Sequence, residues 1–337
     1  MGRYHRLEGQ ARKVPQWQIV LQYLLLVLFG LTLCFGALRL APSNWLTTAD
    51  APLVYIAVGT APEHVERRQA IRATWAKEGS NTQVYFHTEQ TTAKVAREQA
   101  VYKDMLFYPP DAVQYQSGRH HYIDRAFYQM RHFLEAVRPA QYFLRVDDDV
   151  LLCLPRLEAI LSSRDNPHQP LFWGKYWHAS TAHPNQIVRA DESFMLFSAD
   201  IVRWLVQTMT NKMVVLDHNT TFAMHWAWWS HLLKIEIWDD TEGIDSQQAY
   251  LTSYLHNATP PQATDKIMCR DLTVAHHVSP TVMLQIYPTM KQTIPQLPLN
   301  NMTAPSARAY KFTTERYAKA LPKCTCTTLH TLNPKDV

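Results

Sequence analysis

Short apolar runs alternate with segments of helical periodicity along most of the chain. The apolar runs have the length of strands and are Leu53–Gly59, Val84–His87 and Tyr142–Val146. The helical segments around them are Glu63–Trp75, Thr92–Tyr102, Tyr122–Val137 and Leu154–Ser162. This alternation predicts an α/β sandwich with a largely parallel sheet. Such folds bind ligands where the carboxyl ends of strands meet loops, which here are Val58–Thr60 and Asp147–Asp149.

One apolar run is too long for a strand. Ile19–Leu38 has twenty residues and no charged side chain, and at 1.5 Å per residue such a helix crosses the ~30 Å hydrocarbon core of a bilayer. Arg3, Arg6, Arg12 and Lys13 precede it. Because basic flanks stay on the cytoplasmic side, the N-terminus is expected in the cytoplasm and the rest of the chain in the lumen. The alternative, a cleaved signal peptide, usually has a shorter apolar region.

Two features fit a lumenal location. Three N-glycosylation sequons follow the long apolar run, at Asn219, Asn257 and Asn301, and such sites are modified only in the secretory lumen. Four cysteines also follow it, an even number in an oxidising compartment. They are Cys153, Cys269, Cys324 and Cys326. Four cysteines allow three pairings, and the sequence does not choose among them.

The distribution of charge argues against a nucleic acid as partner. The formal net charge is +4. Residues 1–16 hold four basic side chains and one acidic side chain, so they account for +3 of that total. The rest of the chain carries +1, which leaves no basic face for a nucleic acid.

The main chemical signal comes directly after the strand Tyr142–Val146. Asp147, Asp148 and Asp149 are consecutive there, and adjacent carboxylates repel one another unless a cation or hydrogen-bond donors neutralise them. Hard oxygen ligands suit Mg²⁺ or Mn²⁺. Such an ion can hold a diphosphate and offset the charge that develops as the diphosphate leaves. A solvated acidic turn is the alternative, but the position after a buried strand favours the metal site.

A second segment carries paired guanidiniums. On the helix Glu63–Trp75, Arg68 and Arg72 are i,i+4 neighbours and share a face, while Ile71 and Trp75 share another. The face with two guanidiniums could meet phosphate or uracil. A surface helix with a buried tryptophan is the alternative.

These two segments, with three later ones, resemble the beta-1,3-galactosyltransferase and N-acetylglucosaminyltransferase superfamily, glycosyltransferase family 31. The resemblance covers roughly residues 53–290. It is carried by Arg67-Arg68-x-x-Ile71-Arg72-x-Thr74-Trp75, by Phe143-Leu-Arg-Val-Asp-Asp-Asp-Val150, by Leu171-Phe-Trp-Gly174, by Phe194-Met-Leu-Phe-Ser-Ala-Asp200, and by Cys269-Arg270 with Val274-Ala-His276-His277-Val-Ser-Pro280.

The resemblance implies a GT-A fold, a UDP-sugar donor, Mn²⁺ and inversion at the anomeric carbon. By position, Asp149 would bind the metal, and Asp147 and Asp148 would lie near the ribose and the diphosphate, with Asp147 also close to the metal. His276 would be a further metal ligand, with His277 as the alternative. The face formed by Arg68 and Arg72 would line the nucleotide pocket.

The catalytic base is less clearly marked. An inverting transfer needs a carboxylate that takes the proton of the acceptor hydroxyl, and the family's acidic motif is absent here in its usual form. Counting back from Cys269 leads to Asp239 and Asp240, of which Asp240 is the first candidate, because Gly243 and a following helix (Ser246–His256) fit the family's layout. Counting forward from the Ser198–Asp200 segment leads instead to Asp217.

The sequence therefore predicts a hexosyltransferase that moves galactose or N-acetylglucosamine from a UDP-sugar to a glycan hydroxyl of a glycoprotein or glycolipid, with a β1,3 linkage. It predicts a single-pass type II protein of the Golgi membrane. Its parts are a cytoplasmic tail (1–18), an anchor (19–38), a stem (39–52), a lumenal catalytic domain (53–321) and a C-terminal tail (322–337). The alternatives are a membrane-anchored glycan-binding relative that has lost its base and a metal-dependent phosphoesterase.

Overall fold

A computed structural model describes the central part of the chain. The chain divides into two compact units, Met1–Asp50 and Ala51–Val337, and all described residues lie in the second. They are residues 51–89, 92–109, 122–136, 140–164, 166, 169–177, 189–210, 222–223, 226, 230, 235–245, 266–298, 302 and 304–305. Across these ranges no helix is long and apolar enough to cross a membrane. The predicted anchor (19–38) lies outside them.

Several other sequence predictions also fall outside the described residues. They concern the sequons at Asn219, Asn257 and Asn301, the helix Ser246–His256, the alternative base Asp217, and the C-terminal cysteines Cys324 and Cys326. They remain predictions.

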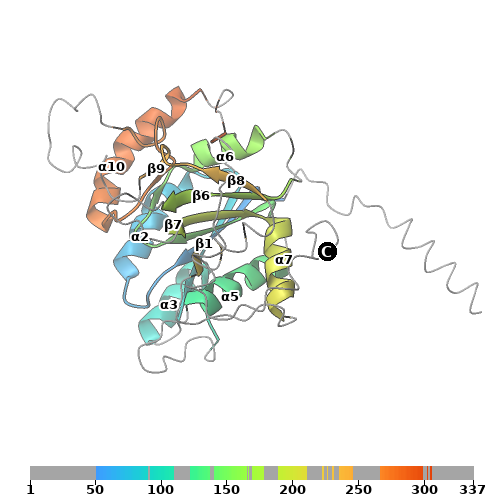
Figure 1. Ribbon diagram of the computed structural model, residues 1–337. Helices are drawn as coiled ribbons and strands as arrows, with labels where there is room; N and C mark the ends of the chain where they lie inside the picture. Colours follow the sequence, from blue (N-terminus) through green and yellow to red (C-terminus); the bar gives the residue numbers. More distant parts are fainter. Residues whose placement is uncertain are drawn as a thin grey trace, which may run out of the picture. The chain divides into compact units, whose positions relative to one another are not determined.

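A seven-stranded sheet forms the centre of the described unit (Figure 1), in the order β3-β2-β1-β4-β7-β6-β8. Neighbouring strands pair in parallel except where β7 runs antiparallel to β4 and β6. The largely parallel α/β sheet predicted from the sequence is therefore confirmed. The strands are β1 (Val54–Gly59), β2 (Thr82–Thr88), β3 (Met105–Phe107), β4 (Tyr142–Asp147), β6 (Leu171–Trp177), β7 (Arg189–Ser198) and β8 (Glu236–Asp239).

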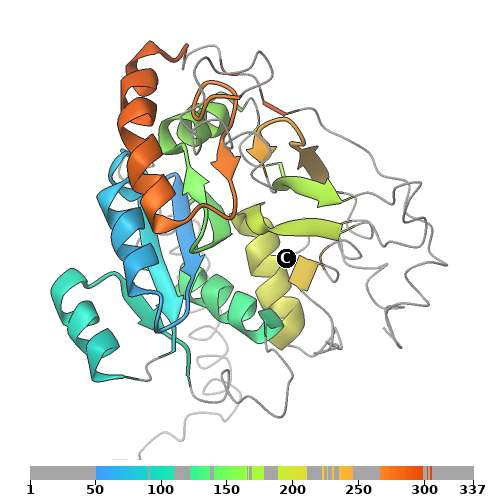
Figure 2. The same ribbon diagram turned by 90° about the vertical axis from the view of Figure 1, so that its left-hand side faces the viewer.

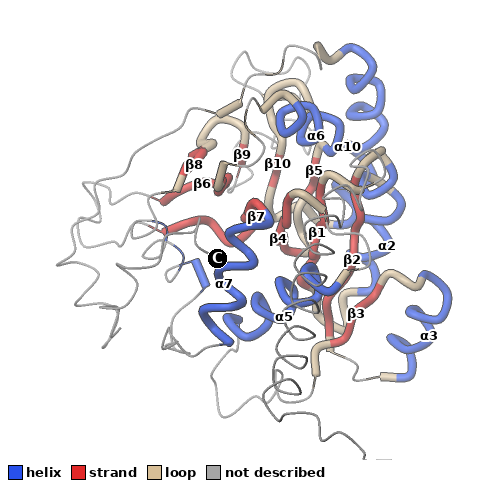
Figure 3. Tube along the Cα trace, turned by 90° about the vertical axis from the view of Figure 1, so that its right-hand side faces the viewer, coloured by secondary structure: helices blue, strands red, loops and turns tan. Residues whose placement is uncertain are grey.

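Helices cover both faces of this sheet (Figures 2 and 3). On one face lie α2 (Val65–Ala73), α6 (Leu154–Ser162) and α10 (Pro280–Thr293), and on the other lie α5 (Tyr122–Glu135) and α7 (Ala199–Thr210). The other helices of the described residues are α3 (Ala93–Tyr102) and two short 3₁₀ segments, η2 (Trp75–Lys77) and η3 (Ile294–Gln296).

The alternation of side chains along a strand explains the two cores. Successive side chains of a strand point to opposite faces. In β1, Val54, Ile56 and Val58 are fully buried in the core that also contains the α2, α6 and α10 side chains. Tyr55 and Ala57 are fully buried in the core that contains α5 and α7. Because both faces are buried, β1 reads in the sequence as a continuous apolar run.

Trp75 connects the end of α2 to the loop that carries the aspartates. The helix predicted over Glu63–Trp75 is shorter in the structure, where α2 ends at Ala73 and a 3₁₀ turn begins at Trp75. The indole of Trp75 is fully buried, and its Nε1 donates a 3.0 Å hydrogen bond to the backbone oxygen of Val150. The side chain thus fixes the chain one residue after Asp149.

A small second sheet returns the C-terminal part of the chain to the same loop. Its strands are β5 (Leu151–Leu152), β9 (Ile244–Asp245) and β10 (Val274–Ala275), in the order β5-β10-β9. A disulfide joins Cys153 to Cys269 across a sequence separation of 116 residues. It selects one of the pairings that the sequence left open for Cys153. Pairing of β10 with β5 brings the residues after Ala275 next to the aspartates.

We expect loss of this disulfide to destabilise the fold. A crosslink that closes a loop of this length restricts the unfolded chain strongly, so Cys153→Ala/Cys269→Ala should lower the free energy of unfolding by about 2–5 kcal/mol. Urea denaturation of the full-length protein would measure it. The wild type unfolded in the presence of a reducing agent serves as the control and should match the double variant. Unchanged stability in both would contradict a structural role for the bond.

Candidate metal and nucleotide site

The three consecutive aspartates lie at the carboxyl end of β4, in the middle of the sheet. In register, Asp147 pairs with Gly59 at the end of β1, and Gly59 pairs with His87 near the end of β2. The aspartates line a cavity of about 730 Å³ at this edge. Its other lining residues are Gly59, Thr60, Ala61, Pro62, Glu63, His64, Arg67, Glu89, Tyr108, Arg125, Gln129, Arg145, His276 and His277.

Asp148 is held by the segment between β1 and α2. Its side chain is 6% exposed. Its Oδ2 accepts a 2.6 Å hydrogen bond from the Thr60 hydroxyl and lies 2.8 Å from His64 Nδ1. Its Oδ1 accepts a 2.7 Å hydrogen bond from Arg67. Asp148 is therefore neutralised within the protein and orients the residues that form one wall of the cavity.

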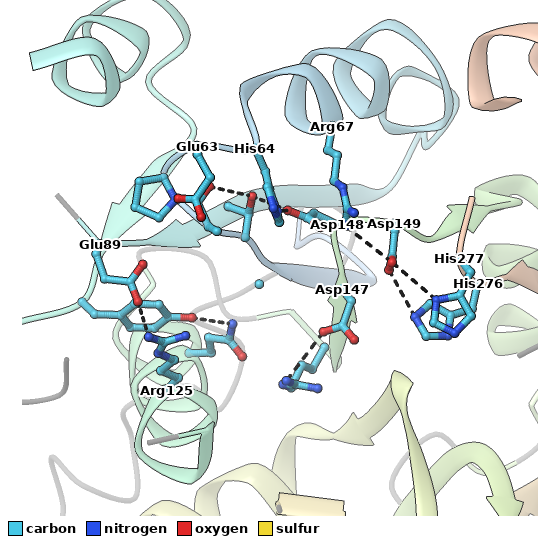
Figure 4. Close-up of a pocket in the computed structure, with 17 residues that line it drawn as sticks. Glu63, His64, Arg67, Glu89, Arg125, Asp147, Asp148, Asp149, His276 and His277 are labelled. Atoms are coloured by element: carbon cyan, nitrogen blue, oxygen red, sulfur yellow. Dashed lines mark hydrogen bonds and ion pairs between the residues drawn. The ribbon is translucent and has the colours of Figure 1, made fainter. Parts of the chain in front are cut away.

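Asp149 faces two histidines from the C-terminal part of the chain (Figure 4). Its Oδ1 lies 3.1 Å from His276 Nε2, and its Oδ2 lies 3.6 Å from His277 Nδ1. Adjacent side chains usually diverge, but His277 has a φ of 60° and its ring stacks on that of His276 at 3.7 Å. This left-handed backbone, which is uncommon for a residue other than glycine, turns both imidazoles toward one carboxylate.

The negative charge of Asp149 and the positive charge of a protonated His276 stabilise each other. Burial alone would raise the pKa of Asp149, but the hydrogen bond from His276 and the charge of Arg67 lower it. Burial alone would lower the pKa of His276, but the Asp149 carboxylate raises it. An arriving cation would replace the proton of this pair, because metal binding requires a neutral imidazole and an ionised carboxylate.

The residues of this cluster fit a divalent metal ion. The possible ligand atoms of Asp149, His276 and His277 all lie within 4.8 Å of one another. One carboxylate oxygen with two imidazole nitrogens is a ligand set that Mn²⁺ accepts. Asp147 lies on the cavity side of the group in Figure 4, and its enclosed position raises its pKa to about 6, against the effect of Arg145. The structure therefore brings Asp149 and His276, two of the predicted metal ligands, together with the alternative His277, and Asp147 lines the same cavity.

Arg68 and Arg72 do not line the cavity, which corrects the prediction for the nucleotide pocket. Arg68 is fully buried and donates hydrogen bonds of 2.9 and 2.7 Å to Glu98 of α3, and one of 2.6 Å to the backbone oxygen of Ala61. Arg72 donates to Glu98 and to Asp104. The two arginines do share a helix face, but that face contacts Glu98 of α3 and Asp104, which follows α3 in the chain.

Arg67, one position earlier, is the arginine of α2 that lines the cavity. A step of one residue turns a helix by about 100°, so Arg67 lies on a different face from Arg68. Its NH1 contacts both Asp148 and Asp149, at 2.7 and 3.4 Å. The sequence patterns assigned no role to Arg67 beyond its place in the motif of α2.

We expect Arg68 and Arg67 to respond differently to substitution. Arg68→Met leaves the buried Glu98 short of a partner and should cost about 3–5 kcal/mol of unfolding free energy. Arg67→Met removes a side chain that is 34% exposed, and this should cost on the order of 1 kcal/mol. Urea unfolding of both variants measures the difference. Equal losses would show that the contacts of Arg68 with α3 do not stabilise the fold.

Asp239 and Asp240, the predicted bases, also lie away from the cavity-lining residues. Asp240 is 8% exposed and accepts hydrogen bonds from the backbone nitrogen of Gly243 at 2.6 Å and from Trp173 Nε1 at 3.2 Å. Asp239 is 3% exposed, and its Oδ1 accepts a 2.9 Å hydrogen bond from the backbone nitrogen of Tyr176. Burial raises the pKa of Asp240, against the effect of its donors. In this structure Asp240 stabilises the turn after β8, and Asp239 connects the end of β8 to β6.

Three tryptophans, Trp226, Trp228 and Trp229, lie close together in the sequence, and the structure describes Trp226. This side chain is fully buried, with its ring 4.7 Å from that of Phe197 and 5.0 Å from that of Phe172. It belongs to the core between the sheet and α7. Trp228 and Trp229 lie outside the described residues.

Substitution of Asp240 distinguishes a structural carboxylate from a catalytic one. The contacts of Asp240 lead us to expect that Asp240→Asn lowers the thermal unfolding temperature, because two buried donors lose a charged acceptor. A pure general base would instead lose turnover with unchanged stability and unchanged nucleotide binding. Thermal unfolding with and without UDP measures the first effect. Asp200→Asn at the start of α7, away from the cavity, is the matched control.

An α/β fold whose cavity lies at the carboxyl ends of parallel strands is typical of proteins that bind a ligand at that edge, and the carboxylate and imidazole cluster there could hold a metal ion. The chain belongs to the Fringe-like family, whose model matches residues 47–223, more than half of the chain. The matched range contains the aspartates and ends before Asp239, Asp240 and His276.

A relative of known name supports this assignment. Mouse beta-1,3-galactosyltransferase 4 is 29% identical to the chain over 132 residues, which is 37% of this chain and 34% of the mouse protein. The match thus spans about a third of that relative. The family match and this relative confirm the resemblance found in the sequence and place the chain among the glycosyltransferases.

Solved structures give weaker similarities. One is a galactosyltransferase in complex with donor and acceptor sugar analogues, with a TM-score of 0.39 and 10% identity over 72% of this chain and 96% of that chain. Another is a glycosyltransferase involved in glycosylation of the major capsid of PBCV-1, with a TM-score of 0.37 and 11% identity over 71% of this chain and 100% of that chain. Because these scores lie below 0.5, the family assignment rests on the sequence matches.

Proposed function

We propose that the protein is an inverting hexosyltransferase that moves galactose or N-acetylglucosamine from a UDP-sugar to a glycan hydroxyl, with Mn²⁺ as cofactor and a β1,3 linkage as product. The observation that carries the proposal is the pairing of Asp149 with His276 and His277 at one side of the cavity. A GT-A fold and a single-pass type II location in the Golgi membrane, with a glycoprotein or glycolipid as acceptor, belong to the same proposal.

The site residues have separate tasks in this function. Asp149, His276 and His277 hold the metal, with Asp147 beside them. When bound, the ion holds the diphosphate and offsets the charge that develops on it as the sugar leaves. Asp148 fixes Thr60, His64 and Arg67, and Arg67 adds a positive charge at the wall nearest the diphosphate.

One observation favours a second function, a glycan-binding relative without turnover. The carboxylates expected to act as base, Asp239 and Asp240, are buried and hydrogen-bonded within the fold. A phosphoesterase is less well supported. It would use a second metal ion, and among the described residues Asp149, His276 and His277 form a single metal-binding group.

UDP release by the full-length protein tests the proposal. With Mn²⁺, the wild type should release UDP from UDP-galactose or UDP-N-acetylglucosamine, and EDTA should abolish the release. Loss of an outer partner of a metal ligand typically costs 10–100-fold, so loss of a ligand by Asp149→Asn should reduce release by at least ~100-fold. Glu66→Gln, which changes an exposed carboxylate of α2 outside the cavity, is the control.

The outcomes separate the two functions. Release that depends on the metal and on Asp149 supports the transferase, and the preferred sugar names the donor. Binding of UDP without release from either sugar would favour the glycan-binding relative. If UDP did not bind at all, the transferase proposal would be wrong.

A further inference from the structure

The cavity has a second end, built from different chemistry. Figure 4 shows Glu89 and Arg125 on the opposite side of Asp147 from Asp149 and the two histidines. Tyr108 and Gln129 line the cavity with them. Glu89 follows β2, Tyr108 follows β3, and Arg125 and Gln129 lie on α5. We call these four residues the amide end of the cavity.

Gln129 has a buried hydrogen-bond acceptor that the described residues leave unused. The residue is 1% exposed. Its Nε2 donates a 2.9 Å hydrogen bond to the Tyr108 hydroxyl. Its Oε1 has no hydrogen-bond partner in the described part of the chain. A buried carbonyl oxygen without a donor is unfavourable, so a ligand that brings an N–H group to this oxygen would remove that cost.

The neighbours of Gln129 supply the complementary group. Arg125 forms an ion pair with Glu89, and the centre of its guanidinium lies 5.7 Å from the centroid of the Tyr108 ring. A guanidinium offers only donors, whereas Oε1 of Gln129 offers only an acceptor. The amide end therefore presents donors and an acceptor beside an aromatic ring. A planar ring that carries an N–H next to a carbonyl oxygen matches this pattern.

Uracil has this pattern, because its N3–H lies between two carbonyl groups. We propose that the amide end of the cavity recognises the base of the donor nucleotide, with Gln129 Oε1 accepting the N3–H of uracil and Arg125 donating to a neighbouring carbonyl oxygen. This inference rests on the proposed function, in which the other end of the cavity holds the diphosphate through a metal.

Gln129 then acts as a specificity-determining residue. Cytosine has a lone pair at N3 in place of the N–H, and this lone pair would face the lone pairs of Gln129 Oε1. A site that hydrogen-bonds a particular group rejects an analogue without it, because a buried polar atom stays unpaired. Selection of UDP over CDP would thus reside on α5, in a residue outside the aspartate and histidine motifs.

Nucleotide binding to the full-length protein in the presence of Mn²⁺ tests this inference. Dissociation constants for UDP, CDP and GDP are measured by calorimetry on the wild type and on Gln129→Met, which keeps the volume and removes the acceptor. The wild type should prefer UDP. In Gln129→Met the ratio of CDP to UDP dissociation constants should fall about tenfold, mainly because UDP binds more weakly.

Two further variants keep the test decisive. Gln285→Met, on the exposed side of α10, should leave the ratio unchanged. Gln129→Glu keeps an oxygen acceptor and should keep the preference for UDP. If thermal unfolding shows that Gln129→Met does not fold, Tyr108→Phe replaces it. That variant removes the hydroxyl that accepts a hydrogen bond from the Gln129 amide nitrogen, and it should weaken the preference in the same direction.

The outcomes distinguish this inference from the proposed function. If the wild type binds UDP with Mn²⁺ but the ratio is the same in Gln129→Met, the base is recognised elsewhere and only the inference is overturned. The same holds if the wild type prefers CDP or GDP. If no nucleoside diphosphate binds with Mn²⁺, the proposed function and the inference are both overturned.

Discussion

The structure around the cavity depends on the neutralisation of three adjacent carboxylates. β4 is buried on both faces and delivers Asp147, Asp148 and Asp149 to one short loop. Carboxylates this close cannot all stay ionised without partners. Asp148 takes its partners from the segment after β1 and Asp149 takes imidazoles from the segment after β10. The charge of one loop therefore determines which distant parts of the chain must meet there.

These contacts connect the fold to the function. Trp75 and the Cys153–Cys269 disulfide fix the chain directly after the three aspartates, at Val150 and at Cys153. Arg68 does not line the cavity. It holds Ala61 and Pro62, which do, through hydrogen bonds to their backbone oxygens. The shape of the cavity therefore depends on buried hydrogen bonds behind the lining residues as well as on the lining residues themselves.

Sequence patterns predicted the sheet and most helices, because apolar runs and periodic segments are local signals, and they placed the three aspartates at a strand end, where their role as metal ligands stays a prediction. They did not locate the cavity side of α2. The spacing of Arg68 and Arg72 correctly placed them on one face, but only the fold shows that Glu98 and Asp104 cover it. Gln129 gave no signal, since a glutamine within an amphipathic helix looks like any surface residue. Its importance comes from Tyr108, which is remote in sequence.

The long span of the disulfide has a consequence for biosynthesis. Cys269 emerges 116 residues after Cys153, and at about 5–20 residues per second this takes on the order of ten seconds. During that interval Cys153 lacks its disulfide partner, and Asp149 lacks its two imidazole partners, because His276 and His277 are made later still. A ribosome that stalls before residue 276 would release a chain with much of the central sheet but without its metal ligands from the C-terminal side. The cluster around Asp149 is therefore completed only by residues that are synthesised well after the strand that carries the aspartates.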